Sequence, residues 1–584
     1  MVKKMDTQYL AQCKQRIESS RKWRKEDGYD GTWRRMVDMY KGRHFDDYKT
    51  EDRMLVNISF STINVISPSI SVNYPKISVN AVSPDNAAQA VIAEAVVNYW
   101  WKHRDIRSQF RRSVKDMLTL GHGWIKVGYR FVEEEDTMGG DTEVSDDVSG
   151  GESTTNSVIL EDSPFAERVS PNDVFVDPDG TSMHDIRWIA QRIRRPIGDV
   201  KQDKRYNKTA REQVKIMAVS RYADDPSRKK IYDKNVGYAE IWEYYDIAAN
   251  TMCIFSEQSE NFLVKPALMP YSFGQPFVML RNYDIPDHFY PMGDLESIEP
   301  LQKELNETRS QMMNHRKKFA RKYLYKENAF DQLGRTALES DQDNVMVPVI
   351  SDESLSGVVS AFPAVINPPE FYNQTNMIIG DIDRISGVTE FQRGGVSEIR
   401  RTATETSLMQ DAANARTSDK LATVEQAIAE IGRRMVHLAQ QYMIGEQVAR
   451  VMGRDGEPMW VNFDREYLKG DFDFEVAAGS TQPANESFRR QMALQMVDAL
   501  APFAGAGIVN MGKLAAYVLQ MGFGVKNPDE FINNAPPQQQ GAPAGAGPAG
   551  PAGPMGPDGG EQPLPPEIEA LLAAQQQPPP TPPQ

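Results

Sequence analysis

The apolar residues between positions 402 and 443 repeat at steps of three and four, which is the spacing of one face of an α-helix. They are Leu421, Val424, Ile428, Ile431, Met435, Leu438 and Tyr442. Thr402 and Glu405 form a capping-box pattern before this stripe, so the helix is predicted to begin at Thr402. About forty residues at 1.5 Å each give a rod of roughly 60 Å, longer than one domain core requires.

The two halves of this long helix differ in pattern. From Ser407 to Lys420 the sequence is polar nearly all round, and the apolar stripe does not continue. We expect this half to face water, a channel or a neighbouring subunit, and the half from Leu421 to pack against a core.

Two more helices are predicted upstream, on either side of a short mixed segment. The first runs from about residue 300 to 325, and its charges are sorted along its length. Acidic residues gather near its start and basic residues at its end: Asp294, Glu296, Glu299, Glu304 and Glu307, then Arg316, Lys317, Lys318, Arg321 and Lys322. This order complements the helix dipole. The alternative interpretation is that the basic end faces a polyanion.

The second of these helices is predicted over residues 367–386, because prolines are tolerated in a first helical turn. Between the two helices, residues 345–350 and 357–362 are candidate strands. A glycine-containing loop over residues 387–401 then leads into the long helix.

The N-terminal segment is charged but not uniformly basic. Residues 1–53 hold fourteen basic and ten acidic side chains. Large apolar residues occur at loosely helical spacing: Trp23, Trp33, Met36, Met39 and Tyr40. The interspersed acids favour a helical, surface-lying segment over a basic arm that binds nucleic acid.

A second basic run follows a helix predicted over residues 84–104. Its cations are Arg107, Arg111, Arg112 and Lys115. Gly121-His-Gly123 then turns the chain into a strand with alternating faces. A phosphate-binding loop would place its glycines between a strand and a helix, and these lie between a helix and a strand, so phosphate binding is not favoured.

Acidic residues are concentrated in three places. Residues 133–162 carry eleven acids and no lysine or arginine, which predicts a disordered or hairpin-tip excursion. Asp177-Pro-Asp179-Gly180 is typical of a turn, because the closing glutamate of a calcium loop is missing. Two strands are predicted over 459–476. The second carries acids on one face, and the alternation of a strand explains these acids better than a metal site does. The clearest other strands are 238–248 and 275–282.

The C-terminal part changes character twice. Residues 486–531 predict a helical bundle, within which 501–525 is apolar enough to imitate a membrane span. Pro502 and several glycines interrupt that stretch, so buried helices are favoured. From residue 535 the chain is rich in proline with glycine in triplets, and five triplets are too few for a triple helix, so a flexible tail is predicted.

Composition narrows the class of protein. The chain has 584 residues, room for three or four domains, and a net charge of −15. A negative charge of this size argues against a protein whose surface is covered with bound nucleic acid. It still allows nucleic acid to move past the surface without strong binding. Cys13 and Cys253 are too few for a disulfide framework or a thiolate metal site, which favours a reducing compartment. The charged N-terminus does not have the pattern of a secretory signal.

The usual catalytic patterns do not occur in the sequence. The seven histidines form no HExxH pair, and neither a GxxxxGK[ST] loop nor a GxSxG motif is present. We therefore expect no enzyme activity, no cofactor, no metal and no catalytic residue.

Several short segments, taken in their order, carry a family resemblance. They are Gly121-His-Gly123 before a strand, Val169-Ser-Pro-Asn-Asp-Val-Phe-Val-Asp-Pro-Asp-Gly180, Leu301-Gln-Lys-Glu-Leu-Asn-Glu-Thr-Arg309, Gly387-Val-Thr, the Gly394-Gly395 loop and Thr402-Ala-Thr-Glu405. In this order, over most of residues 30–530, the chain resembles bacteriophage portal proteins of the short-tailed-phage type, the head-to-tail connector rings through which DNA enters and leaves a capsid.

The resemblance implies a predominantly helical α+β portal fold that forms a ring with wing, stem, clip and crown. The implied parts are the wing at 1–293 (acidic loop 133–162) and 446–480, stem helices at 294–326 and 368–386, the clip at 327–367, a tunnel loop at 387–401, the long helix at 402–445, the crown at 481–534 and a disordered Pro/Gly-rich tail at 535–584.

The resemblance also implies function and partners. The chain would form a dodecamer at one capsid vertex, with double-stranded DNA passing through its channel during packaging, retention and ejection. The terminase large subunit would dock at the clip and an adaptor or head-completion protein would follow it there, while major capsid and scaffold proteins would surround the wing. The ring would be assembled in the host cytoplasm, would belong to the virion and would involve no membrane.

The site residues that follow from the resemblance fall into three groups. The tunnel loop would present Arg393, Gly394, Gly395, Arg400 and Arg401 to DNA; the stem and clip would share a basic patch of Arg316, Lys317, Lys318, Arg321 and Lys322; Thr402 and Glu405 would cap the long helix. Two rival functions stay open. One is a metal-dependent nuclease that uses Asp177, Asp179, Asp471 and Asp473, and the other is a non-channel virion structural or scaffold protein.

Overall fold

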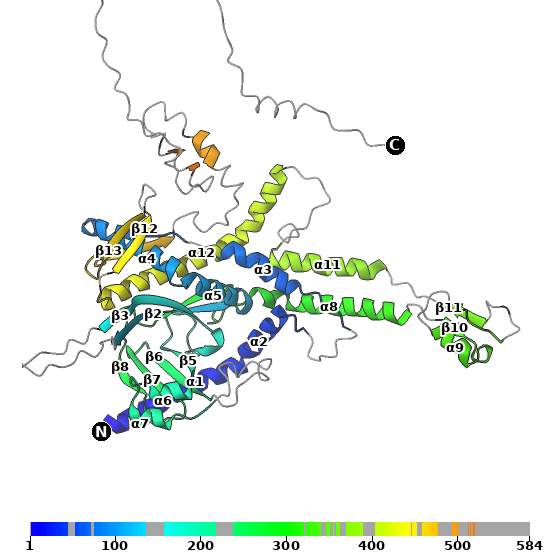
Figure 1. The fold of residues 1–584 in the computed structure, drawn as a ribbon, viewed down its shortest axis with the longest axis horizontal. Coiled ribbons are helices and arrows are strands. Elements are labelled where there is room, and N and C mark those ends of the chain that lie inside the picture. The colour runs from blue at the N-terminus through cyan, green and yellow to red at the C-terminus, as the bar shows by residue number, and fades with distance from the viewer. Residues whose placement is uncertain are drawn as a thin grey trace, which may run out of the picture.

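The computed structural model describes residues 2–44, 53–71, 75–135, 157–217, 237–319, 323–339, 346–350, 354, 358–361, 369–388, 403–445, 447–452, 458–476, 493–498, 500, 512, 514–515 and 518–519. Helices and strands are interspersed along this part of the chain, which confirms the predicted α+β class. Figure 1 shows a body of short sheets and helices, from which one pair of helices extends toward a small separate group of strands.

The chain begins with two helices, α1 (Val2–Glu26) and α2 (Tyr29–Tyr40), separated by Gly28 at φ 79°. The predicted helices are present, but the segment does more than lie on the surface. Buried residues of α1 and α2 belong to two separate cores: Leu10, Cys13 and Ile17 in one, and Trp33, Met36 and Met39 in the other. Charged residues between these positions mask the apolar pattern.

Arg24 shows how a charged side chain of this segment can be buried. Its side chain is 2% exposed and donates to the carboxylate of Asp30 at 2.5 Å and to the carbonyl oxygen of Val174 at 3.0 Å. Its guanidinium also stacks 4.3 Å from the ring centroid of Phe175 and 4.7 Å from that of Trp33. A buried guanidinium with these partners has its donors satisfied and its charge paired.

The largest sheet has five antiparallel strands in the order β4-β5-β6-β7-β8. They are β4 (Val174–Val176), β5 (Trp188–Pro196), β6 (Tyr238–Asp246), β7 (Thr251–Ser256) and β8 (Val264–Leu268). Helix α1 packs near β4, and the short helices α6 (Ile197–Gln202) and α7 (Lys208–Gln213) follow β5. The strand predicted at 238–248 is β6.

A second sheet has the order β3-β2-β9. Its strands are β2 (His122–Glu135), β3 (Ser157–Val169) and β9 (Phe277–Arg281), and the 3-10 turn η3 (Pro171–Asp173) follows β3. Strands β2 and β3 pair as a hairpin from Trp124↔Val169 to Glu135↔Ser157. The two ends of the acidic excursion are therefore a hairpin, and its tip lies outside the described residues.

Three helices and two strand pairs complete the body around the long helix. The helices are α3 (Ile58–Ile70), α4 (Ala87–His103), preceded by η2 (Pro84–Asn86), and α5 (Ile106–Leu120). The strand pairs are β1 (Ile77–Ala81) with β14 (Phe472–Val476), and β12 (Gln447–Met452) with β13 (Pro458–Phe463). The two strands predicted over 459–476 are β13 and β14.

The long helix α12 (Ala403–Tyr442) lies across this body, as the pattern predicted (Figure 1). Val424, Ile428, Ile431, Met435 and Leu438 are each fully buried, and they belong to a core shared with α2 to α5 and β2. The predicted apolar stripe is therefore confirmed as the face that organises the main core.

The extending part consists of α8 (Asp294–Phe319), a small group of elements and α11 (Pro369–Ser386). The small group holds β10 (Tyr323–Tyr325), η5 (Glu327–Ala329), α9 (Gln332–Glu339) and β11 (Val359–Ala361), with β10 and β11 antiparallel. The first helix was predicted over 300–325, but it begins at Asp294, contains Pro300, and ends before β10.

One predicted strand of this small group is wrong. Residues 346–350 form no strand, although Val347 and Val349 do turn toward the core formed by Ala329, Phe330 and Val358. The alternation is real, but Pro348 between them has no amide proton to donate to a neighbouring strand.

Most of the predicted helical bundle at 486–531 lies outside the described residues, and so does the whole tail at 535–584. None of the described helices is long and apolar enough to cross a bilayer.

Candidate functional site

Helices α8 and α11 lie side by side and connect the body to the small group of strands (Figure 1). Leu305 and Met312 of α8 and Ile378 and Ile382 of α11 are buried. The hydroxyl of Thr375 lies 3.7 Å from the Met312 sulfur. These residues form an apolar seam between the two helices, which are here called the arm.

The inner end of the arm is packed against a glycine turn. Gly121, at φ 91°, ends α5, and a Cβ there would lie 2.0 Å from the carbonyl oxygen of Pro291. A Cβ on Gly293 would lie 2.8 Å from the carbonyl oxygen of Thr119. Both positions need glycine because two backbones approach closely, which explains the first glycine of the Gly121-His-Gly123 motif. The second has the same cause, because a Cβ on Gly123 would lie 2.2 Å from the carbonyl oxygen of Ser113.

A buried ion pair joins the first residue of α8 to the long helix. Lys420 Nζ lies 2.5 Å from a carboxylate oxygen of Asp294, and the two side chains are 6% and 2% exposed. Asp294 also accepts from Asn282 Nδ2 at 3.1 Å and from the Tyr283 hydroxyl at 3.2 Å. The Lys420 ammonium lies 4.4 Å from the Tyr283 ring centroid. These partners compensate for removing both charges from water.

Polar residues at every fourth position of α8 hold the chain segment that leads into α3. The buried Gln302 accepts from the amides of Ile58 and Ser59, at 3.1 and 3.2 Å. Asn306 accepts from the amide of Val56 at 3.1 Å, and the Ser310 hydroxyl from that of Met54 at 2.9 Å. Gln302 Nε2 donates back to the carbonyl oxygen of Val56 at 2.7 Å. The inner half of α8 is thereby fixed to the N-terminal part of the body.

The C-terminal half of α12 is hydrogen-bonded to the segment between β13 and β14 and to the start of β9. Gln440 Nε2 donates to the carbonyl oxygens of Leu468 and Gly470, at 2.7 and 3.0 Å. Arg434 donates to the carbonyl oxygens of Gln275 and Phe277, each at 3.0 Å, and burial lowers its pKa. The long helix is thus hydrogen-bonded to segments on two sides.

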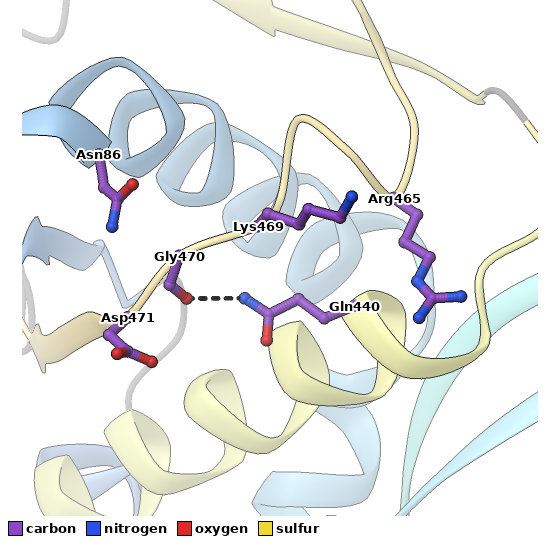
Figure 2. Close-up of a pocket in the computed structure, with 6 residues that line it drawn as sticks. All are labelled: Asn86, Gln440, Arg465, Lys469, Gly470 and Asp471. Carbon is purple, nitrogen blue, oxygen red and sulfur yellow. Dashed lines mark hydrogen bonds between the residues drawn. The ribbon is translucent and has the colours of Figure 1, made fainter.

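A shallow polar pocket of about 350 Å³ lies beside Gln440. Figure 2 shows its lining residues: Asn86, Gln440, Arg465, Lys469, Gly470 and Asp471. Lys469 pairs with Glu466 at 3.4 Å, and the Gln440 to Gly470 hydrogen bond closes one side. The pocket has neither a nucleophile next to a base nor a set of metal ligands, so we assign it no chemistry.

Most of the site residues predicted from the sequence lie outside the described part of the chain. This is true of Arg321, Lys322, Arg393, Gly394, Gly395, Arg400, Arg401 and Thr402. Arg316 and Lys317 are exposed in the last turns of α8, and Lys318 belongs to the same helix. Glu405 lies in the first turn of α12.

The acids of the rival nuclease hypothesis do not gather into one site. Asp177 and Asp179 both pair with Arg187 beside β4, whereas Asp471 and Asp473 belong to the segment that forms β14. Those two strands belong to different sheets. Within the described residues, no group of three or more His, Cys, Asp or Glu side chains is placed to hold a metal ion.

The residues that sequence reasoning missed are those that hold the arm in place. Asp294 was attributed to dipole matching and Lys420 to a polar surface, and the structure pairs them. A signal was present, because Lys420 lies four residues before Val424 and therefore on the apolar stripe. Gln302 and Asn306 were part of the motif from Leu301 to Arg309, but their hydrogen-bond partners could not be inferred from it.

The chain was compared with protein families, curated proteins and solved structures. Residues 142–578 match the family model described as "Phage SU10 portal protein". No curated protein matches. Among solved structures, a chain of the "Virion of native gene transfer agent (GTA) particle" is similar with a TM-score of 0.39 and 10% identity, covering 83% of this chain and 93% of that one. Because the family match spans well over half of the sequence, the chain belongs to the phage SU10 portal protein family, a family of structural, non-enzymatic proteins of the virion.

Proposed function

We propose that the protein forms a ring with a central channel at one vertex of a phage capsid, through which double-stranded DNA is packaged, retained and ejected. The observation that carries the proposal is the family match over residues 142–578, which contains α8, α11 and α12. A head-to-tail contact between identical chains forms a closed ring when its repeated rotation adds up to a full turn. One arm per chain would then give a tube of helices.

The parts of the proposed ring follow the elements. The stem is the arm of α8 and α11, the clip is the group of elements between them, and the wing comprises the body built on α12. The crown and the tail are proposed for residues 481–534 and 535–584, and the ring is proposed to be a dodecamer.

The anchoring of α8 supports this role. A channel that guides DNA under load needs helices that do not slide relative to the wing. The Asp294–Lys420 pair and the hydrogen bonds of Gln302 and Asn306 fix α8 at its inner end, where each partner has one geometry. A shift of α8 by one turn, about 5.4 Å, would separate Asp294 from Lys420 and leave both charges buried without each other.

The proposed contacts with DNA are few. DNA must slide through the channel, and each phosphate that a protein holds adds affinity that depends on salt. We assign transient contacts to the tunnel loop with Arg393, Arg400 and Arg401, and to the basic patch that includes Arg316 and Lys317. The proposed partners are the terminase large subunit and then an adaptor at the clip, and capsid and scaffold proteins around the wing.

Electron microscopy of the purified full-length chain tests the ring directly. Negative-stain images are expected to show rings with a central hole, and class averages give the number of subunits. Particles that stay monomeric at every protein concentration and salt condition would rule out the proposed function.

The DNA contacts are tested separately in a phage that depends on this gene. Replacing Arg393, Arg400 and Arg401 together with alanine is expected to leave rings intact and to lower the yield of packaged genomes. The matched control replaces Lys201, Lys204 and Lys208, three exposed lysines of the body, with alanine. Equal genome yields for both variants would remove the tunnel-loop assignment while leaving the ring.

A further inference from the structure

The only two cysteines of the sequence meet in one core of the structure. Cys13 lies on α1 and Cys253 on β7. Both are free thiols, their exposed fractions are 0% and 1%, and both belong to the core that α1 shares with the five-stranded sheet. Because a disulfide needs two thiols close together in space, this pair is a candidate site for one.

Side-chain contacts fix the register of α1 along β7. The hydroxyl groups of Tyr9 and Thr251 lie 3.4 Å apart. About three helical turns later, the Arg21 guanidinium donates to the carboxylate of Glu257 at 3.2 Å. Helix and strand therefore run in the same direction. Twelve residues of helix rise about 18 Å and six residues of strand about 20 Å, so the two elements stay in step over this length.

This register places Cys13 beside Cys253. Cys13 follows Tyr9 by four helical residues, about 6 Å, and Cys253 follows Thr251 by two strand residues, about 7 Å and on the same face. A second contact agrees with this placement. Arg16, one turn after Cys13, donates to the Tyr244 hydroxyl at 2.9 Å, and Tyr244 is the cross-strand partner of Cys253 on β6.

Packing alone does not explain why both positions are cysteine. A buried cysteine behaves as a small apolar residue, and alanine or valine would serve the same purpose. The neighbouring Cys13 side chain and burial raise the pKa of the Cys253 thiol. The thiolate, which is the reactive form, is therefore scarce while α1 lies on the sheet. Oxidation needs α1 to move away briefly, so its rate follows this local opening.

We propose that Cys13 and Cys253 are a modification site, where an intrachain disulfide forms once the protein leaves a reducing compartment. The chain belongs to a family of virion proteins, and outside a cell thiols are no longer kept reduced. The bond would join α1 to β7 and close a loop of roughly 240 residues in the unfolded chain, which disfavours unfolding. This inference concerns the single chain and does not depend on the proposed channel.

The oxidant is a small-molecule disulfide. The thiolate of one cysteine attacks one sulfur of the oxidant, the S–S bond of the oxidant breaks, and the first small thiolate leaves and takes up a proton. The thiolate of the other cysteine then attacks the protein sulfur of this mixed disulfide and releases the second small thiolate. The two protein thiols lose two electrons and two protons in total, and the oxidant gains them.

Oxidised glutathione tests the site on the full-length protein, purified with both thiols reduced. Acid stops the exchange, and alkylation of the denatured chain followed by mass spectrometry counts the remaining thiols. We expect a chain lighter by two hydrogen atoms, with no alkylated cysteine and with the peptides of Cys13 and Cys253 linked. The ratio of this product to glutathione adducts should be at least about tenfold higher for the folded chain than for the chain unfolded in urea.

A variant with a displaced thiol is the matched control. Cys13→Ala combined with Ile17→Cys keeps two cysteines in the same core but moves one of them by one helical turn. The displacement of about 6 Å takes the two Cα atoms beyond the reach of a disulfide. This variant should form at least about tenfold less intrachain disulfide. Thermal unfolding verifies that it is folded, and the comparison of folded with unfolded unchanged chain stands without it.

The disulfide should also raise the thermal unfolding midpoint of the unchanged chain by at least about 2 °C, and dithiothreitol should reverse the shift. Cys253→Ala, incubated with oxidised glutathione in the same way, should show no such shift.

Three results would overturn the inference. The folded chain could keep both thiols at every temperature below its unfolding midpoint, or it could form only glutathione adducts and disulfides between two chains. Either result would make the two cysteines plain apolar core residues. The variant with the displaced thiol could also form the intrachain disulfide as readily as the unchanged chain, which would show that the register of α1 does not select the pair.

Discussion

Lys420 Nζ of the long helix lies 2.5 Å from the carboxylate of Asp294, the first residue of α8, and both side chains are almost fully buried. The two residues are 126 positions apart in sequence. A buried charge is costly without its partner, so this pair permits one placement of α8 relative to α12 and penalises others. It is the clearest single contact that fixes the arm of α8 and α11 to the body.

Removing one member of this pair should destabilise the protein strongly. Lys420→Met leaves the Asp294 carboxylate buried with only neutral partners, and the expected loss is about 3–5 kcal/mol of unfolding free energy. Adding Asp294→Asn to this variant removes the orphaned charge and should recover most of the loss. Chemical denaturation monitored by tryptophan fluorescence measures both changes.

Lys303→Met is the matched control for this experiment. Lys303 is 56% exposed and pairs with Glu299 one turn away on α8. Such an exposed pair contributes less than about 1 kcal/mol, so the control should unfold almost as the unchanged protein does. Equal effects at positions 303 and 420 would show that the buried pair has no special importance.

Gln302 is expected to be essential for the start of α3. Gln302→Leu leaves the buried amides of Ile58 and Ser59 without this acceptor, at an expected cost of about 1–3 kcal/mol. Hydrogen exchange should become faster at the amides of residues 56–59 before it does elsewhere in the body. Gln311→Leu, at an exposed position of the same helix, should leave exchange in that segment unchanged. Faster exchange in both variants would point to loosening of α8 as a whole.

The sequence predicted the elements that depend on one repeating pattern. The stripe from Leu421 to Tyr442 fixed both the type and the buried face of α12, because periodicity follows from helix geometry alone. The predicted end of α8 at residue 325 is wrong, because Tyr323, Leu324 and Tyr325 form strand β10. These residues suit a strand as well as a helix, and the pairing with residues 359–361 decides between them.

Contacts between distant segments were not predictable in the same way. The β-branched run that begins at Ile58 forms helix α3, since Asn57 accepts from the amide of Phe60 and Gln302 accepts from two further amides. One of these caps is local and visible in the sequence, while the other comes from a residue 244 positions away from Ile58. The Asp294–Lys420 pair was missed for the same reason: each residue had a sufficient local explanation.

Gly121 should not tolerate any side chain. Gly121→Ala places a Cβ 2.0 Å from the backbone oxygen of Pro291 and holds alanine at φ 91°, so the predicted loss of stability is more than about 1 kcal/mol. Gly380→Ala is the matched control, because a Cβ at Gly380 of α11 meets no atom within 4 Å. Removing glycine from a helix interior should stabilise the control by up to about 1 kcal/mol. Thermal unfolding midpoints that move in the same direction for the two variants would contradict this explanation of the turn.

His122 should make the stability of the body depend on pH. The imidazole is fully buried between Trp33 and Tyr290, with ring centroids 4.7 and 4.9 Å away. Burial, with the nearby charges of Arg24 on α1 and Arg281 on β9, lowers its pKa from 6.5 to about 3. As pH falls below 6.5, the unfolded chain binds a proton at this residue and the folded chain does not. Its contribution is therefore complete above pH 6.5 and is lost as pH falls toward 3.

The expected size of this effect is about 2 kcal/mol between pH 6.5 and 5, because each pH unit corresponds to about 1.4 kcal/mol for one group. His122→Phe keeps an aromatic ring in the cluster and removes the titration. Between pH 6.5 and 5, the unfolding free energy of this variant should therefore fall by about 2 kcal/mol less than that of the unchanged protein. His184→Asn replaces an exposed histidine and should keep the full pH dependence of the unchanged protein. Denaturation curves recorded at half-unit pH steps compare the three proteins, and parallel slopes for the His122 variant and the unchanged chain would exclude the buried imidazole as the titrating group.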